Sequence, residues 1–376
     1  MKNFMINNFI VICLFAFNIA ASAHNNVVVI PLLGDESKPL QNVISVAVSN
    51  GDFTDPIAAL ASISDESENN PYLIVIGPGV YQLSEQLVMR EYINIVGSGK
   101  GITRLIGSVS DSFNGNSSAL VVGAANTTLS SLTVENIDGE NGTSVGISCN
   151  GPSPVSPALI DLEILLSGGR DQTGLYTGNA ASPTLESVDI ILRDGSGEQS
   201  GTRSGVSAGY KASRTNILVE NGGGLQRGIY SPTTGLITLN DSQITVRGGA
   251  GGQFGAEIND RSSLRLSDSS ISLTNSGALQ AGLRLASEST GTVTNSTIRV
   301  FDASEVGVGI SRSSNSTAIV RGSTVRGNTG SVIAAFTTNT TTDYISDSIL
   351  SDEPFGTNRC SFVFLEDGTP INNDCE

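Results

Sequence analysis

The chain has 376 residues, of which 43 are glycine, four are cysteine, one is histidine and none is tryptophan. Hydrophobic residues make up 38% and charged residues only 15%, so the chain can form a core and is not a disordered polyelectrolyte. The formal net charge of −16 opposes binding to nucleic-acid phosphates. Because His24 is the sole histidine, sites built on several histidines are excluded.

The first 23 residues have the pattern of a secretory signal peptide. Lys2 gives a basic start, residues 9–17 form an apolar stretch, and residues 21–23 read Ala-Ser-Ala, a small-residue cleavage site. Cleavage after Ala23 would leave His24 at a new N-terminus, where a catalytic role is not expected. We therefore predict a secreted or periplasmic protein without a membrane span, with residues 24–41 as an extended lead-in.

Export sets the expected state of the cysteines. Cys13 leaves with the signal peptide, and Cys360 and Cys375 enclose a short segment near the C-terminus. An oxidising compartment favours a disulfide between these two. Cys149 falls on an inward position of a predicted strand, so it is expected to be a buried, inert thiol.

The chain opens with a predicted cap and continues as short strands. Residues 43–48 alternate as in a strand, and Asp55 followed by Pro56 marks the start of a short helix. After about residue 65 no helical period is present, and apolar residues alternate with polar ones.

The main feature of the sequence is an internal repeat of about 27 residues. Matched apolar residues stand 27 positions apart at Ile217, Ile244, Ile271, Ile298 and Val325. Each repeat adds a second strand of the form Gly-apolar-x-apolar, as in residues 255–258 and 282–285. Because such a unit cannot bury its own apolar side, the repeats are expected to stack into a solenoid.

A second set of residues follows the same spacing between two strands of each repeat. Its members are Asp241, Asp268, Asn295, Gly322 and, in the last unit, Asp347. Asp, Asn and Gly tolerate a left-handed backbone, which a sharp corner between strands requires. A column of calcium ligands is the alternative, but it does not account for the Asn and Gly members. We therefore predict no metal site and no cofactor.

The succession of cap, early glycine-rich coils at residues 74–81 and 95–106, and repeated corners resembles the pectin lyase-like superfamily. This resemblance implies an all-β, right-handed parallel β-helix of roughly ten coils over residues 42–352. Each coil would have three strands and a two-residue corner between the second and third. Residues 353–376 would then form a C-terminal tail with the Cys360–Cys375 disulfide.

The catalytic motifs of the known enzymes in this superfamily are not found. The paired Asp-Asp and the Gly-His-Gly of polygalacturonase-type members are missing, as is the Arg-x-Pro-x-x-Arg motif of pectate and pectin lyases. Asp52-Phe53 is similar to part of the pectinesterase pattern but precedes the coils. No functional residue can therefore be transferred by motif.

The x residues of the Gly-apolar-x-apolar strands are expected to form one outward row. The row is predicted to contain Ser148, Tyr176, Ser207, Tyr230, Glu257, Arg284 and Gly309. Tyr176 and Tyr230 offer flat faces for sugar rings, and Glu257 beside Arg284 offers polar recognition. The competing interpretation is a surface ion pair with two ordinary tyrosines.

The connections before this row are expected to be longest in the early coils, at residues 135–143, 167–173 and 193–204. Long loops on a rigid scaffold commonly carry function. Asp171, Asp194, Glu198, Arg203 and Glu257 are therefore the catalytic candidates, for acid/base cleavage of a glycosidic bond or for β-elimination with an arginine.

Three functions remain open. The leading prediction is a secreted scaffold that binds a polysaccharide or cell-surface glycan without cleaving it. The alternatives are a polysaccharide lyase or hydrolase with a site near the early loops, and a purely structural or adhesive solenoid.

Overall fold

The computed structural model divides the chain into two units, residues 1–36 and 37–376. It describes residues 42–137, 142–275, 279–313, 315–334, 343–352 and 358–371, all in the second unit. The predicted signal peptide with Cys13, the lead-in with His24, and Cys375 lie outside the described residues. The cleavage site and the Cys360–Cys375 disulfide therefore stay predictions.

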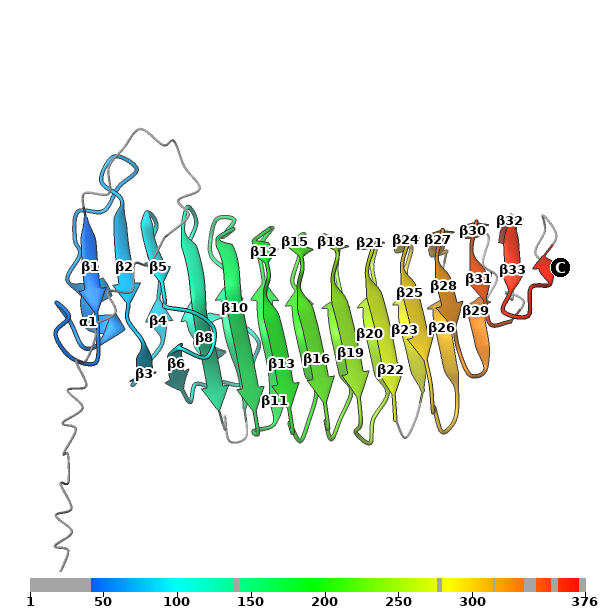
Figure 1. Ribbon diagram of the computed structural model, residues 1–376, viewed down its shortest axis with the longest axis horizontal. Helices are drawn as coiled ribbons and strands as arrows, with labels where there is room; N and C mark the ends of the chain where they lie inside the picture. Colours follow the sequence, from blue (N-terminus) through cyan, green and yellow to red (C-terminus); the bar gives the residue numbers. More distant parts are fainter. Residues whose placement is uncertain are drawn as a thin grey trace, which may run out of the picture. The chain divides into compact units, whose positions relative to one another are not determined.

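Short strands stack in chain order and form three faces (Figure 1). Within each face neighbouring strands run parallel, except for the last strand pair of the chain. Face 1 consists of β1 (Val43–Val46), β2 (Tyr72–Ile76), β5 (Ile93–Val96), the first parts of β8 (Thr128–Ile137) and β10 (Ala158–Ser167), β12 (Thr184–Glu186), β15 (Tyr210–Ser213), β18 (Leu236–Asn240), β21 (Ser263–Ser267), β24 (Thr290–Thr294), β27 (Thr317–Arg321), β30 (Asp343–Ser346) and β32 (Asn358–Ser361). Face 2 consists of β3 (Gly79–Gln82), β6 (Thr103–Gly107), the second parts of β8 and β10, β13 (Asp189–Arg193), β16 (Asn216–Glu220), β19 (Gln243–Arg247), β22 (Ser270–Thr274), β25 (Thr297–Val300), β28 (Thr324–Arg326), β31 (Ile349–Leu350), β33 (Val363–Leu365) and its antiparallel partner β34 (Pro370–Ile371). Face 3 consists of β4 (Leu87–Val88), β7 (Ala119–Val122), β9 (Thr143–Cys149), β11 (Asp171–Thr177), β14 (Gln199–Ser204), β17 (Gln226–Ser231), β20 (Gln253–Ile258), β23 (Gln280–Leu285), β26 (Gly307–Arg312) and β29 (Gly330–Ala334).

These faces confirm the predicted all-β, right-handed parallel β-helix, which has about 11 coils and almost no helix. The expected cap helix is α1 (Pro56–Ala61), where Pro56 is the first helical residue and the side chain of Asp55 accepts a hydrogen bond from the Ile57 amide at 2.9 Å. Beyond residue 352, β32 and β33 stack on β30 and β31 in parallel. Coil stacking thus continues into the segment that was expected to be a tail.

The corner between faces 1 and 2 is left-handed, as the sequence predicts. The φ angles are 48° at Asp241, 49° at Asp268, 49° at Asn295, 56° at Gly322 and 50° at Asp347. The corresponding corners in other coils are also left-handed, although they hold Arg214 (47°) and Phe362 (55°). Stacking therefore imposes this conformation even on side chains that disfavour it.

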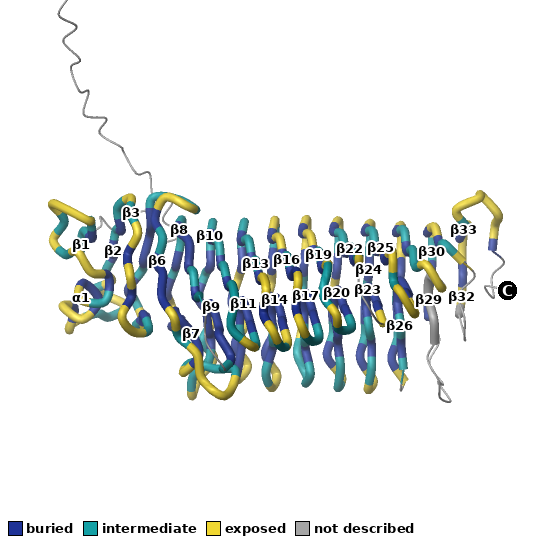
Figure 2. The backbone as a smooth tube through the Cα atoms, turned by 90° about the horizontal axis from the view of Figure 1, so that it is seen from below, coloured by how far each residue is buried: buried dark blue, intermediate teal, exposed yellow. Residues whose placement is uncertain are grey.

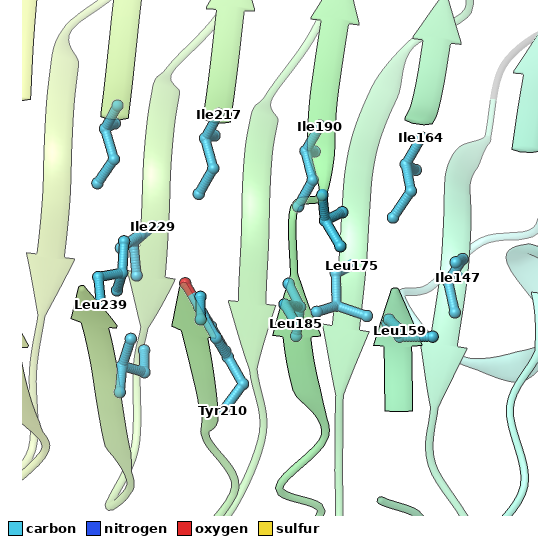
Figure 3. Close-up of a cluster of buried hydrophobic side chains, with 14 of the residues drawn as sticks. Ile147, Leu159, Ile164, Leu175, Leu185, Ile190, Tyr210, Ile217, Ile229 and Leu239 are labelled. Atoms are coloured by element: carbon cyan, nitrogen blue, oxygen red, sulfur yellow. The ribbon is translucent and has the colours of Figure 1, made fainter. Parts of the chain in front are cut away.

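The interior is filled by apolar side chains from all three faces (Figure 3). Buried residues recur from coil to coil along the stack (Figure 2). One inward column on face 2 holds Ile164, Ile190, Ile217, Ile244, Ile271 and Ile298, all almost completely buried. A Cβ atom built on the facing glycines of face 3 would lie 2.2–2.4 Å from the Cγ2 atoms of these isoleucines. The facing glycines are Gly146, Gly174, Gly201, Gly228, Gly255 and Gly282. Glycine is therefore required on face 3 because isoleucine fills the space opposite. Cys149 is also buried and free, as expected, and burial raises the pKa of its thiol to about 12.

Buried polar side chains bond to their own equivalents in neighbouring coils. The hydroxyls of Ser242, Ser269, Ser296, Ser323 and Ser348 each accept the backbone amide of the residue one coil earlier and donate to a carbonyl two residues back. Because every coil supplies the partner of the next, the polar atoms beside the corner are satisfied without water.

Face 3 contains a glutamine ladder that the sequence analysis did not identify. Its members are Gln172, Gln199, Gln226, Gln253 and Gln280, all buried. The amide of each later glutamine donates to the side-chain oxygen of the preceding one at 2.8–3.3 Å. Such chains of amides polarise one another and fix the register between coils.

Gln226→Ala is expected to lower the free energy of unfolding by about 2–4 kcal/mol, because it removes the buried donor to Gln199 Oε1 and one acceptor of Gln253 Nε2. The measurement is urea unfolding followed by circular dichroism. Gln243→Ala is the matched control, since Gln243 is exposed on β19, and it should change stability by less than about 0.5 kcal/mol. Equal losses in the two variants would contradict a stabilising ladder.

A buried ion pair closes the C-terminal coils. Arg312 on β26 and Asp343 on β30 are fully buried and contact each other, and Asp343 Oδ1 accepts the Ala318 amide at 2.8 Å. Arg312 takes the interior position that Ile258 and Leu285 hold in the two preceding coils. Burial raises the pKa of Asp343 from 3.8 to about 6, although Arg312 and the Ala318 amide both act to lower it.

We expect Asp343 to make the protein more stable as the pH falls from about 6 towards 4. A folded-state pKa above the unfolded value means that the folded chain takes up the proton first, so this contribution is full below about pH 4 and is lost as the pH rises through 6. Urea unfolding between pH 4 and 7 should show this slope in the wild type and a smaller one in Asp343→Asn. Asp347→Asn, at an exposed corner, should keep the wild-type slope. An unchanged slope in Asp343→Asn would refute the assignment.

Candidate functional site

Face 3 has two rows of side chains on the side away from the core. The first row is Thr173, Ser200, Arg227, Phe254, Ala281 and Val308. The second row is Ser148, Tyr176, Arg203, Tyr230, Glu257, Arg284 and Ser311. Neighbours within a row are about one strand spacing, ~4.8 Å, apart. The rows therefore bring the predicted residues Tyr176, Tyr230, Glu257 and Arg284 onto one strip.

The predicted row was wrong at two positions, Ser207 and Gly309. Arg203 occupies the place predicted for Ser207, which lies outside the strands, and Ser311 occupies the place predicted for Gly309. The physical reason is the glycine column, because the interior glycine of β14 is Gly201. Its strand reads Gly-Thr-Arg-Ser and lacks the apolar residues on which the motif relied.

Charged side chains link four successive coils across this strip. Arg227 donates from Nε to Glu257 Oε2 at 2.5 Å and from Nη1 to Glu198 Oε2 at 3.1 Å. Arg284 donates from Nη1 to Glu257 Oε1 at 3.0 Å. Both Glu257 oxygens are thus engaged, and its side chain is only 7% exposed. The predicted Glu257–Arg284 ion pair exists, but Glu257 is a buried acceptor for two arginines.

The two tyrosines are less open than the sequence suggests. The guanidinium carbons of Arg203 and Arg227 lie 4.8 and 4.2 Å from the centre of the Tyr230 ring. Tyr176 is half-buried and packs on a small apolar cluster that includes Ala119 and Val145. The strip therefore presents guanidinium planes and partly covered rings rather than two free aromatic platforms.

The loop candidates separate into two groups. Asp194 has a φ of 56° and belongs to a second left-handed corner, shared with Asn221 (57°) and Gly248 (65°), which accounts for it structurally. The expected long loop at residues 193–204 is wrong, since residues 199–204 form β14. Asp171, Glu198 and Arg203, in contrast, line one small pocket of about 50 Å³.

Both oxygens of Asp171 in this pocket are already engaged. Oδ1 accepts the Glu198 amide at 2.8 Å, and Oδ2 accepts Arg170 Nε at 2.9 Å. Glu198 is 55% exposed and uses one oxygen on Arg227. Arg203 has no carboxylate within ion-pair distance among the residues that the structure describes, and its guanidinium contacts the Tyr230 ring.

The extended connection that borders this pocket is one the sequence analysis missed, residues 108–118 between β6 and β7. Asn114 from this loop lines the pocket together with Thr143 of β9. Asp111 and Thr143 exchange two backbone hydrogen bonds at 3.1 and 2.7 Å, which hold the loop against face 3. Residues 108–118 match no repeat, and this gap in the repeat pattern could have identified the loop from the sequence.

A wider groove of about 490 Å³ follows the corner between faces 1 and 2. Its lining includes Asp241, Asp268 and Asn295, which the left-handed corner itself requires. Across the described ranges no group of three or more His, Cys, Asp or Glu side chains could hold a metal ion. No helix in the same ranges is long and apolar enough to cross a membrane.

No family model and no curated protein matches the chain. Solved structures with similar folds include pectin methylesterase from carrot, with 18% identity over 68% of this chain and 85% of that chain and a TM-score of 0.46. Pectate lyase Pel9A has 13% identity over 89% and 80% of the two chains, with a TM-score of 0.43. The A-module of mannuronan C-5 epimerase AlgE4 from Azotobacter vinelandii has 12% identity over 83% and 91%, with a TM-score of 0.41. At these identities the likeness concerns the fold and assigns no activity to this chain.

Arg227→Ala is expected to lower the free energy of unfolding by about 3 kcal/mol, because it removes a buried guanidinium from the buried Glu257. Arg284→Ala is the matched control. Its side chain is 42% exposed, so the loss should stay below about 1 kcal/mol. Guanidinium chloride would screen the charges, so urea unfolding is the suitable measurement. A larger loss in the control would show that Arg284 is the main partner of Glu257.

Proposed function

We propose that face 3 binds a glycan chain along its second row of side chains, where Tyr176, Arg203, Tyr230 and Arg284 are partly exposed, and does not cleave it. Arg203 supports this, because its guanidinium lies beside Tyr230, borders a pocket and has no carboxylate partner among the described residues. A planar guanidinium group carries five N–H donors, which can hydrogen-bond the hydroxyl or carboxylate oxygens of a sugar. The predicted signal peptide would bring this face to extracellular or periplasmic glycans.

The state of the carboxylates favours binding over cleavage. Glycosidic cleavage needs two carboxyl groups that face the bond, one to donate a proton and one to act as nucleophile or base. Glu257 and Asp171 each have both oxygens occupied by arginine or amide donors. Each of these two carboxylates is therefore held by protein donors at both oxygens, and neither presents an oxygen without a protein partner to a substrate.

Glu198 and Arg203 give a second candidate function, a lyase or hydrolase. Both line the small pocket, and the exposed Glu198 side chain can reach solvent. An exposed carboxylate in the same pocket as a guanidinium is a minimal arrangement for proton abstraction with charge neutralisation. A purely structural solenoid is the remaining alternative.

Arg203→Ala is expected to weaken glycan binding at least tenfold, because it removes the one cation of the pocket that has no carboxylate partner among the described residues. The wild type is first tested on a panel of neutral and acidic polysaccharides by glycan array, and affinity for the strongest binder is measured by calorimetry. Arg265→Ala, exposed on face 1, is the matched control and should bind like the wild type. Unaltered affinity in Arg203→Ala would place binding elsewhere.

The same panel is followed for new reducing ends and unsaturated ends. Binding without new ends supports the proposal. Turnover that Glu198→Gln abolishes would replace it with the enzymatic alternative, and neither binding nor turnover would favour the structural one.

A further inference from the structure

We propose that the C-terminal end of face 1 binds a sugar carrying a tetrahedral oxyanion, a phosphate or sulfate ester, in a hollow between Arg321 and Arg359. This site lies on a different face from the row proposed to bind a glycan, and it does not depend on that proposal. Three observations carry it: two arginines without carboxylate partners, an exposed tyrosine in the same hollow, and small residues that open the hollow between them.

Three neighbouring strands position these side chains. β27, β30 and β32 lie side by side in consecutive coils of face 1 (Figure 1). Tyr344 pairs with Arg359, and Arg321 pairs with Ser346, which in turn pairs with Ser361. Because side chains alternate along a strand, all five lie on the outer side of the face. The two arginines stand at opposite corners of a rectangle, with their Cα atoms about 12 Å apart.

The hollow between the arginines has a volume of about 250 Å³. It forms because the position of Arg321 is taken by serine in each of the next two coils, so the surface is lower there. Ser346, Ser361 and Tyr344 line it with hydroxyl groups, which add donors to those of the arginines. None of the described residues that line it is acidic. The lining therefore offers hydrogen-bond donors and positive charge.

No ion pair balances the charge of the two arginines. Both side chains are exposed, and among the residues that the structure describes neither guanidinium has an ion-pair or hydrogen-bond partner. Arg326 on face 2, in contrast, is paired with Glu366. Asp347 at the adjacent corner is beyond ion-pair distance of both arginines, and counting it still leaves one positive charge in excess. Since charges beyond about 8 Å are largely screened at physiological ionic strength, the hollow attracts an anion although the whole chain is negative.

The placement of the arginines favours a tetrahedral anion over a planar one. A guanidinium forms two parallel hydrogen bonds when the anion presents two oxygens to it. A carboxylate has two oxygens, so it fills the fork of one arginine. A phosphate ester has three terminal oxygens, as a sulfate ester does, and it can present a pair to each of two arginines that approach from opposite sides. The two-arginine hollow is therefore predicted to select such an ester over a uronic acid.

Tyr344 supplies the contact for the sugar. Its side chain is 47% exposed, and its strand lies between the two strands that carry the arginines. A tyrosine ring has an apolar body and a polar hydroxyl, which suits a partner that is apolar in one part and wet in another. The C–H side of a sugar ring and its hydroxyl groups match these two parts. The ester then lies between the arginines, and the sugar ring lies on Tyr344.

The test measures affinity by calorimetry on the full chain after signal removal, at low ionic strength. The probes are the 6-phosphates and 6-sulfates of glucose, galactose and mannose, the corresponding uronates, the free sugars and inorganic phosphate. We expect the best ester to bind at least tenfold more tightly than its uronate and its free sugar, and more tightly than inorganic phosphate. The tighter of the phosphate and sulfate esters identifies the anion that the site takes.

Arg321→Ala and Arg359→Ala should each weaken ester binding about tenfold, because each removes one of the two guanidinium groups. Tyr344→Ala should weaken binding of the sugar ester about fivefold and leave inorganic phosphate unchanged. Arg299→Ala is the matched control, since Arg299 is an exposed arginine on β25 of face 2, and it should bind like the wild type. All four side chains are at the surface, so each variant should melt like the wild type.

Three results would overturn the site: uronates that bind as tightly as the esters, inorganic phosphate that binds as tightly as the sugar esters, or unchanged affinity in both arginine variants. Absence of binding by every anionic probe would do the same. Arg203→Ala separates this proposal from the one for face 3, because it should leave ester binding unchanged while it weakens glycan binding there.

Discussion

The interlock between isoleucine on face 2 and glycine on face 3 is the contact on which the rest of the structure depends. Each isoleucine Cγ2 atom lies only 2.2–2.4 Å from the position that a Cβ atom would take on the opposite strand, from Ile164 against Gly146 to Ile298 against Gly282. Because this contact recurs once per coil, it fixes both the width of the interior and the register of face 3. Any side chain larger than hydrogen at these glycines would have to displace a packed backbone.

The repetition of similar coils also determines which partners the buried polar groups bond to. In an ordinary domain each buried amide or hydroxyl needs a different partner, whereas here it bonds to its own equivalent one coil away. Gln226, for example, receives from Gln253 and donates to Gln199. Arg312 and Asp343 show what happens where the repeat weakens, since an arginine replaces the interior leucine and needs a dedicated carboxylate. In regular coils the buried polar groups therefore bond to equivalent residues of the next coil. In an irregular coil a buried polar group needs a partner of a different kind, such as Asp343 for Arg312.

The sequence predicts the fold well because the repeat period is the number of residues in one coil of the stack. The 27-residue spacing of Ile217, Ile244 and Ile271 and the Asp241 corner needed only local reasoning about alternation and left-handed backbone. The site was harder to predict, because its residues depart from the repeat pattern. Arg203 lies on a strand without apolar residues, and Gln172 and Gln199 fall in segments that were expected to be loops. Asp194 was a catalytic candidate, but it occupies a left-handed corner, and only its φ angle shows this.

This regularity provides a criterion for function in a solenoid. A polar side chain whose partner is its copy in the next coil is explained by folding, and so are the serine column, the glutamine ladder and the asparagine and aspartate corners. Glu257 is explained by Arg227 and Arg284, and Asp171 by Arg170 and the Glu198 amide. Around the small pocket, two groups of the described part of the chain are left over: Asn114 Oδ1, which has no hydrogen-bond partner there, and Arg203, which has no carboxylate there within ion-pair distance. Both line the pocket that residues 108–118 border, and stacking alone accounts for neither residue.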